Sequence, residues 1–214
     1  MKRIVKDPDI RKNELIDIAA KLFMTKGYEE TSISDIANKA KVAHGTFYYY
    51  FESKEKMLDA IVEKYQNEML TLVEKLAENK KRNAVEKFLE ILQFKMDISS
   101  SGKKFWRYVL SDKNAMLHIK FEKELLPRFS KPLAEIIKQG VKEGFFDCKY
   151  ADYAALYVLN VNISLGIGSD FYDKPVEEQR ELIFIVFNMI ERILGAKSGI
   201  FLKYIKKQNL KVKF

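Results

Sequence analysis

TSISDIANKAKVAHGTFYYYF, residues 31–51, contains the pattern of two short helices joined by a tight turn. The hydroxyl of Ser32 can cap the backbone amide of Asp35 while the Asp35 carboxylate reaches back, which is a capping box with Asp in place of Glu. The helix that starts there should end near Ala40, and a second short helix should follow from His44. This spacing predicts a helix-turn-helix.

An earlier helix completes the predicted N-terminal domain, residues 9–69, in which the helix-turn-helix motif occupies residues 32–51. It can begin at Asp7-Pro8, because Asp caps a helix and Pro suits the first turn, and Gly27 would end it. Two short helices need a third to close their core. The earlier helix supplies an apolar stripe for that core, made of Leu15, Ile18, Ala19, Leu22 and Phe23.

A long helix is predicted from Ser53 to about Leu76, because apolar residues keep helical spacing throughout this range. Its length would be about 36 Å, so we expect it to join the N-terminal domain to a second domain, residues 70–214. No run alternates as a half-buried strand would, and the chain is expected to be all-α, with about nine helices. The expected breaks between the later helices are NKKRN (79–83), SSSG (99–102), Pro127, Pro132, Gly140, Gly144 and Pro175.

The second helix of the motif can present side chains to DNA. At 100° per residue, and with Phe47 and Phe51 buried, Gly45 and Tyr49 point farthest from the core. Three consecutive tyrosines cannot all be buried on one side, and an exposed tyrosine can donate to a phosphate or contact a thymine methyl. An inert helical hairpin is the alternative. The expected DNA contacts are Thr31, Ser32, Ala43, His44, Gly45, Thr46, Tyr48, Tyr49, Tyr50 and Lys54.

The net charge of +8 and the isoelectric point near 9.3 suit a nucleic-acid partner, but the charge is unevenly placed. Residues 1–60 hold eleven Lys or Arg against ten Asp or Glu, a net charge of +1. Six lysines and no acid lie in the last twenty residues, where a basic tail can simply be solvated or can touch phosphates nonspecifically. DNA binding must therefore depend on individually placed groups.

Around the motif, over roughly residues 9–69, the sequence resembles the N-terminal domain of the TetR (tetracycline repressor) family. A weaker similarity, to the turn before the family's dimerisation helices, lies in QGVKEGFFDCKYADYAAL (139–156). The family often has Ser where this chain has Ala43 and His where it has Tyr50, and a missing Ser cap could cost about 1 kcal/mol of helix stability. The residues that carry the resemblance are Leu15-Ile16, Ala19-Ala20, Leu22-Phe23, Gly27-Tyr28, Thr31-Ser32-Ile33, Asp35-Ile36-Ala37, Ala40, Val42, Gly45 to Phe51 and Ser53-Lys54-Glu55.

The resemblance implies an all-helical homodimer whose C-terminal domain is a helical bundle that binds a small molecule and dimerises. The sequence supports the dimer independently, because the helix predicted at Val176 to Leu194 is apolar nearly all round and must be covered on most sides. The helix before it, Tyr150 to about Gly168, has small residues that allow close approach. A packed monomer core is the alternative. The expected dimer interface comprises Ala155, Leu159, Gly166, Ile183, Phe187 and Ile190.

Large apolar side chains between residues 84 and 172 suggest a largely apolar effector cavity, although each of them is more often part of a core. By the resemblance, an effector that prefers the dimer with misaligned DNA-binding domains would lower the affinity for DNA, through the long helix. The candidate pocket residues are Phe105, Trp106, Arg107, His118, Phe121, Tyr157 and Asn160.

Other classes of protein fit the sequence poorly. His44 and His118 lack metal-ligand spacing, and neither a phosphate-binding glycine loop nor a nucleophile motif occurs, so no enzyme, metal or cofactor is expected. The apolar run 182–190 is too short to span a membrane and no secretory signal is visible, which favours the cytoplasm. We expect a transcriptional regulator that binds double-stranded DNA as a repressor, released from a palindromic operator by the effector. A DNA-binding factor without an effector, and an activator, remain alternatives.

Overall fold

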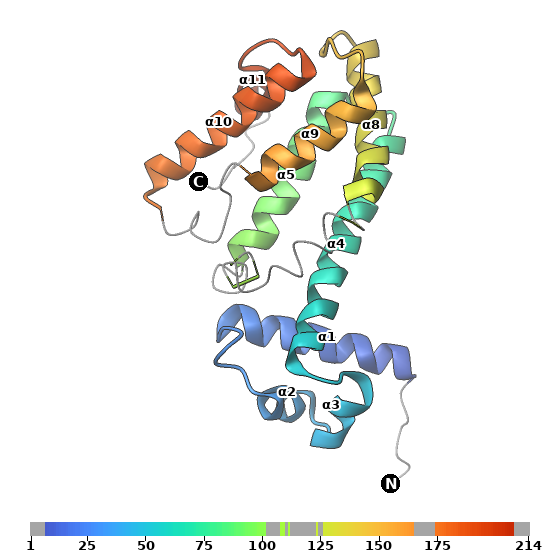
Figure 1. Cartoon of the computed structure of the whole chain (residues 1–214), viewed down its shortest axis with the longest axis vertical. Helices are drawn as coiled ribbons and strands as arrows, with labels where there is room; N and C mark the ends of the chain where they lie inside the picture. The colour runs from blue at the N-terminus through green and yellow to red at the C-terminus, as the bar shows by residue number, and fades with distance from the viewer. Residues whose placement is uncertain are drawn as a thin grey trace.

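The computed structural model of the chain describes residues 7–101, 108, 109, 111, 123, 126–164 and 174–207. All the regular elements in these ranges are helices, as predicted, and they form a lower and an upper unit joined by one long helix (Figure 1). The helices are α1 (Pro8–Thr25), α2 (Ile33–Ala40), α3 (His44–Tyr50), α4 (Lys54–Glu78), α5 (Ala84–Ser101), α8 (Leu126–Lys142), α9 (Ala151–Ser164), α10 (Val176–Leu194) and α11 (Ile200–Lys207).

The lower unit consists of α1, α2, α3 and the first turns of α4, around one apolar core. Asp7 caps α1 by accepting from the amide of Asp9 at 2.9 Å, and Ser32 forms the predicted capping box with Asp35 at the start of α2. The helices therefore begin where the sequence predicts. The fully buried core side chains are Leu15, Ala19, Phe23, Ile36, Phe47, Met57 and Ile61.

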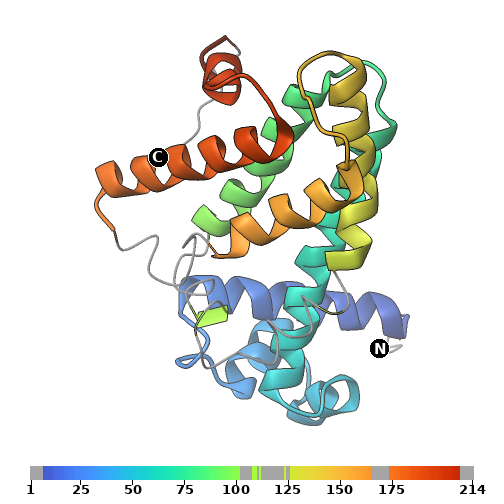
Figure 2. The same cartoon turned by 45° about the horizontal axis from the view of Figure 1, so that its top comes forward.

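Helix α4 belongs to both units. Ser53 caps its start, and Tyr65 packs against the lower core, whereas Met69 and Leu70 pack against the upper one. At its far end the buried ammonium of Lys87 donates to the carbonyl of Ala77 at 3.2 Å, and burial lowers the pKa of this group. Both views show α4 rising from the lower unit alongside α8 (Figures 1 and 2).

In the upper unit α8 packs against α4, α5 and α9. The helix continues through two positions where the sequence predicted a break. Pro132 and Gly140 both lie inside α8, where burial of the helix outweighs the backbone bond that Pro132 removes. A Cβ on Gly140 would lie 2.1 Å from the Phe146 ring, so the glycine serves close packing. The break expected at 99–102 is also misplaced, since α5 continues to Ser101.

The end of the upper unit is fixed by a buried carboxylate. Glu191, in α10, accepts from the amides of Gly199 and Phe201 at 2.8 and 3.3 Å and so caps α11. The ring of Phe201 then stacks on Phe187, with centroids 5.4 Å apart. Within the described ranges, no helix combines the length and the apolar character that crossing a bilayer requires.

Candidate nucleic-acid interface

Helix α3 presents its outer face at the bottom of the lower unit (Figure 1). Phe47 is fully buried, while the side chains of Tyr49 and Tyr48 are 76% and 50% exposed, and His44 is exposed as well. The rotation expected from the helical period therefore matches the structure. Tyr49 also packs edge-on against the half-buried Tyr50, with centroids 4.8 Å apart, which orients an otherwise free ring.

The start of α3 is open. Ala43 has extended backbone angles and provides no side-chain cap, and a Cβ placed on Gly45 would meet nothing within 4 Å. Thr46 is half-buried and its amide bonds back to the Ala43 carbonyl at 2.8 Å. The surface next to Gly45 thus allows close approach of a partner, and free amides at a helix start favour an anion.

Ser32 is exposed, but its hydroxyl is engaged locally. It accepts from the amide of Asp35 at 3.1 Å and donates to the Asp35 carboxylate at 2.8 Å. Lys26 pairs with the same carboxylate at 2.8 Å, and the hydrogen bonds from Lys26 and Ser32 hold the pKa of Asp35 well below its usual range. Any contact from Ser32 to a phosphate must form next to this negative charge.

Two expected DNA contacts point inward instead. Thr31 is fully buried and its hydroxyl donates to the Gly27 carbonyl at 2.7 Å, so it is unavailable to a phosphate. The ammonium of Lys54 donates to the carbonyls of Tyr28 and Thr31, each at 3.1 Å. Both residues fasten the turn between α1 and α2, which sequence reasoning could not see because the turn and the start of α4 are distant in the chain.

Exposed cations beside the motif were missed by the sequence reasoning. Lys39 lies in the last turn of α2, and Lys41 follows it with a left-handed backbone, φ 55°. Both side chains are exposed, and neither has a hydrogen bond or ion pair within the part of the chain that the structure describes. Their position in the turn of the helix-turn-helix could have indicated them. They are the natural candidates for phosphate contacts.

A residue from outside the predicted N-terminal domain completes its core. Val109 is only 5% exposed and packs in the lower apolar cluster, and the neighbouring Tyr108 packs against the same cluster. The lower unit therefore draws on a segment beyond α5. The domain bounds 9–69 and 70–214 stay a prediction.

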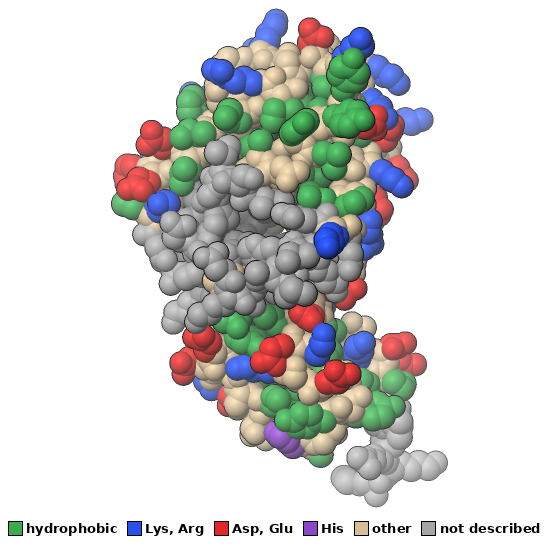
Figure 3. All heavy atoms as spheres, viewed as in Figure 1, with side chains coloured by type: hydrophobic (Ala, Val, Ile, Leu, Met, Phe, Trp, Pro, Cys, Tyr) green, Lys and Arg blue, Asp and Glu red, His purple; other side chains and the backbone are tan. Residues whose placement is uncertain are grey.

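The residues expected at a dimer interface are mostly used within the chain. Ala155, Ile183, Phe187 and Ile190 are buried in the upper core, because α10 packs on α9 and Phe187 stacks on α11. Leu159 is half-buried, and Gly166 lies outside the described residues. The same two helices carry a different, exposed apolar face, visible in the upper part of Figure 3, which we call the α9–α10 face. It comprises Tyr150, Tyr153, Tyr157, Phe184, Ile185 and Met189.

The expected effector pocket is only partly placed. Tyr157 is 64% exposed and Asn160 is exposed with its amide bonded to the Leu156 carbonyl of its own helix, at 2.8 Å, so both face outward rather than into an interior cavity. The other five candidates, Phe105, Trp106, Arg107, His118 and Phe121, lie outside the described residues.

Residues 15–61 match the family model described as bacterial regulatory proteins, tetR family. The transcriptional repressor KstR2 of Rhodococcus jostii (strain RHA1) is 28% identical over 138 residues, which are 64% of this chain and 68% of that protein. The fatty acid metabolism regulator protein of Bacillus subtilis (strain 168) is 34% identical over 74 residues, 35% of this chain and 37% of that protein. For other curated relatives the match spans about a fifth to a third of their length.

Among solved structures, RolR in complex with its ligand resorcinol superimposes with a TM-score of 0.61. The superposition covers 91% of this chain and 92% of that one, at 19% sequence identity. Likeness at this level of identity concerns the fold, and it extends over both the lower and the upper unit.

Proposed function

The chain belongs to the TetR family of bacterial regulatory proteins, and from this premise we propose that it is a transcriptional repressor released from a palindromic operator by a small-molecule effector. The observation that carries the proposal is the exposed face of α3, with Tyr49 76% exposed beside an open Gly45. Such a helix can enter the major groove and place hydroxyls and backbone at base edges and phosphates. The protein would act in the cytoplasm, where it meets double-stranded DNA.

The second part of the proposal is a homodimer formed through the α9–α10 face. Tyr150, directly before α9, and Tyr153 and Tyr157 on α9 recur at helical spacing and are each more than 60% exposed. Phe184 and Met189 are exposed on α10, which packs against α9. An exposed apolar surface of this kind is typical of an interaction site. A two-fold interface would bury it against its own copy, and two DNA-binding units would then read the two halves of a palindrome.

The third part is a largely apolar effector bound in the upper unit. RolR was solved with resorcinol, an aromatic molecule, and KstR2 is named a repressor. These names support a ligand-responsive repressor without identifying the ligand of this chain. A thermal-shift screen with apolar acids, phenols and strongly polar metabolites tests this part, and stabilisation by polar metabolites alone would contradict it.

The DNA-binding part is tested by selection of bound sites from random duplex DNA. We expect the wild-type chain to recover a palindrome, and Tyr49→Ala to abolish specific binding while the melting temperature stays unchanged. Ile10→Ala is the control, since it removes an apolar side chain that is 57% exposed at the start of α1, outside both the helix-turn-helix and the α9–α10 face. Recovery of no common sequence by the wild-type chain, or of the same sequence with equal affinity by Tyr49→Ala, would count against the assignment.

A further inference from the structure

We propose that Lys54 is a positioning residue of the DNA-binding unit, which holds the turn between α1 and α2 in place and does not contact a phosphate. The turn comprises residues 26–32, from the end of α1 to the cap of α2. The effect of Lys54 on DNA affinity rests on the proposed function, whereas its interaction with the turn does not.

The ammonium of Lys54 has no donor left for DNA. Its Nζ lies 3.1 Å from the carbonyl oxygens of Tyr28 and Thr31 and 3.4 Å from that of Glu29. An ammonium carries three N–H donors, and three carbonyls surround this one. The Nζ also lies 4.4 Å from the centroid of the Tyr28 ring, within range for a cation–π interaction. The side chain is therefore satisfied inside the unit.

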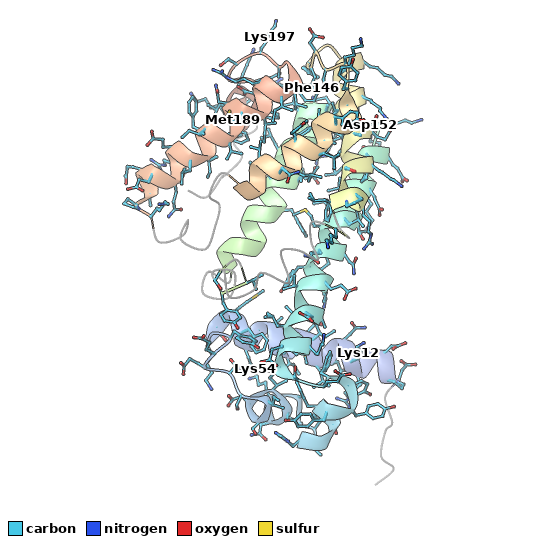
Figure 4. The ribbon with its side chains drawn as sticks, in the orientation of Figure 1. Lys12, Lys54, Phe146, Asp152, Met189 and Lys197 are labelled. Carbon is cyan, nitrogen blue, oxygen red and sulfur yellow. The ribbon has the colours of Figure 1, made fainter. Side chains whose placement is uncertain are left out.

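Lys54 can affect the position of α3, the helix proposed to contact DNA, through the turn and α2. Lys54 is the first residue of α4, and the turn that it grips ends at Ser32, the cap of α2. Helix α2 in turn packs on α3. Figure 4 shows Lys54 on the side of the unit where α1 runs into α2, away from Lys12 near the start of α1. Loosening the grip would let α2 and α3 shift relative to α4.

The turn itself depends on such a grip. The backbone of the turn is irregular, because Gly27 has φ +104° and the Thr31 amide bonds to the Tyr28 carbonyl at 3.2 Å. Three of its carbonyls, those of Tyr28, Glu29 and Thr31, converge on one cation. Thr31, fully buried, closes the turn from within. Lys54 thus bonds to the carbonyls of Glu29 and Thr31 and adds a second donor to the Tyr28 carbonyl, which also accepts from the Thr31 amide.

The salt dependence of DNA affinity separates positioning from phosphate contact. Each lost phosphate contact lowers the slope of log affinity against log salt by about 0.9. We expect Lys54→Met, which keeps the aliphatic stem, to bind the selected duplex about tenfold more weakly at every KCl concentration, with an unchanged slope. Lys41→Ala is the matched control and should lower the slope by about one per DNA-binding unit. A slope that falls in Lys54→Met as it does in Lys41→Ala would overturn the proposal.

Lys54→Arg gives a second test that does not need the Met variant to fold. A phosphate accepts Arg readily, but a planar guanidinium cannot direct its donors to three carbonyls placed around one point. We expect Lys54→Arg to lose affinity, and wild-type affinity in this variant would overturn the proposal.

Amide hydrogen exchange tests the hold without DNA. In both variants the Thr31 amide should exchange faster than in the wild-type chain, while exchange in α9 stays the same. Unchanged exchange at Thr31 would also overturn the proposal. If the wild-type chain selects no duplex, the proposed function fails, and the exchange measurement still decides the role of Lys54.

Discussion

The ring of Tyr28 stacks on the ring of Tyr108, with the ring centroids 4.3 Å apart and the planes inclined by 22°. Tyr28 lies in the turn that Lys54 grips, whereas Tyr108 comes from the segment after α5. Burial, and then the neighbouring Glu55 and Tyr108, raise the pKa of the Tyr28 phenol. A residue of the later part of the chain thus touches the same turn that positions the recognition helix.

We predict that Tyr28 and Tyr108 contribute jointly to stability. Each should be replaced by Leu, singly and together, and the free energy of unfolding measured in urea. A stacked aromatic pair contributes about 0.5–1.5 kcal/mol beyond its buried area, so the double variant should lose less than the sum of the single losses.

The control for this cycle is Ile10→Ala, combined with Tyr28→Leu. Ile10 is 57% exposed at the start of α1, and its loss should simply add to the other. Strict additivity in the Tyr28 and Tyr108 pair would show that the stacked rings contribute nothing of their own.

The sequence predicted those parts of the fold that depend on neighbouring residues. Asp7 and Ser32 cap α1 and α2 as predicted, and the bounds of α3 and α10 also agree, because caps and helical periodicity act over a few residues. The outward rotation of Tyr49 followed from the same periodicity.

Contacts between distant residues could not be predicted in this way. Thr31 and Lys54 look like phosphate donors in the sequence, but they meet in space and satisfy the α1–α2 turn. Pro132 looks like a break, yet α8 is covered on several sides and continues through it. Ile183 and Phe187 look like an interface, yet α11 and α9 cover them within one chain. In each case tertiary packing decided which partner a suitable residue found.

We predict that the Asp35 carboxylate stabilises the lower unit only while it is ionised. The pKa of the Asp35 carboxyl is lowered in the folded chain. At pH values between the folded pKa and the ordinary value of about 3.9, the unfolded state therefore binds a proton that the folded state does not. The stabilisation is therefore complete above that value and is lost as the pH falls through the lower folded pKa. Asp35→Asn should melt at a lower temperature than wild type at pH 7, and the difference should shrink on acidification.

Thermal melting from neutral to acidic pH checks this prediction. Asp152→Asn is the control, because Asp152 is an exposed carboxylate of the upper unit that also pairs with a lysine, Lys138. A gap between wild type and Asp35→Asn that stayed constant down to strongly acidic pH would argue against the capping carboxylate.

We predict that Ala43→Ser strengthens the start of α3. Ala43 is exposed, has the extended backbone that a cap requires, and makes no side-chain cap bond. A Ser hydroxyl there could accept from an amide in the first turn, which typically adds about 1 kcal/mol of stability. Urea unfolding should show this gain, and affinity for the selected duplex should rise or stay equal. Ala43→Val, which cannot cap, should show no gain, so an equal gain in both would refute the capping argument.

The last prediction concerns the α9–α10 face, where Phe184 is 52% exposed in the single chain. In a two-fold interface each substitution occurs on both subunits. Phe184→Glu would therefore place two unpaired carboxylates between apolar surfaces, which is strongly unfavourable. We expect the dissociation constant of the dimer to rise at least about a hundredfold. Light scattering at micromolar concentration should then report a monomer.

Ile10→Glu separates this effect from a general response to surface charge. Ile10 is 57% exposed, comparable to Phe184, but it lies at the start of α1 in the lower unit, far from α10 (Figure 1). It should leave the dimer intact. Since one palindrome needs two DNA-binding units, Phe184→Glu should also weaken operator binding although it touches no DNA. A Phe184→Glu chain that stays dimeric at the concentrations where wild type does would place the interface elsewhere.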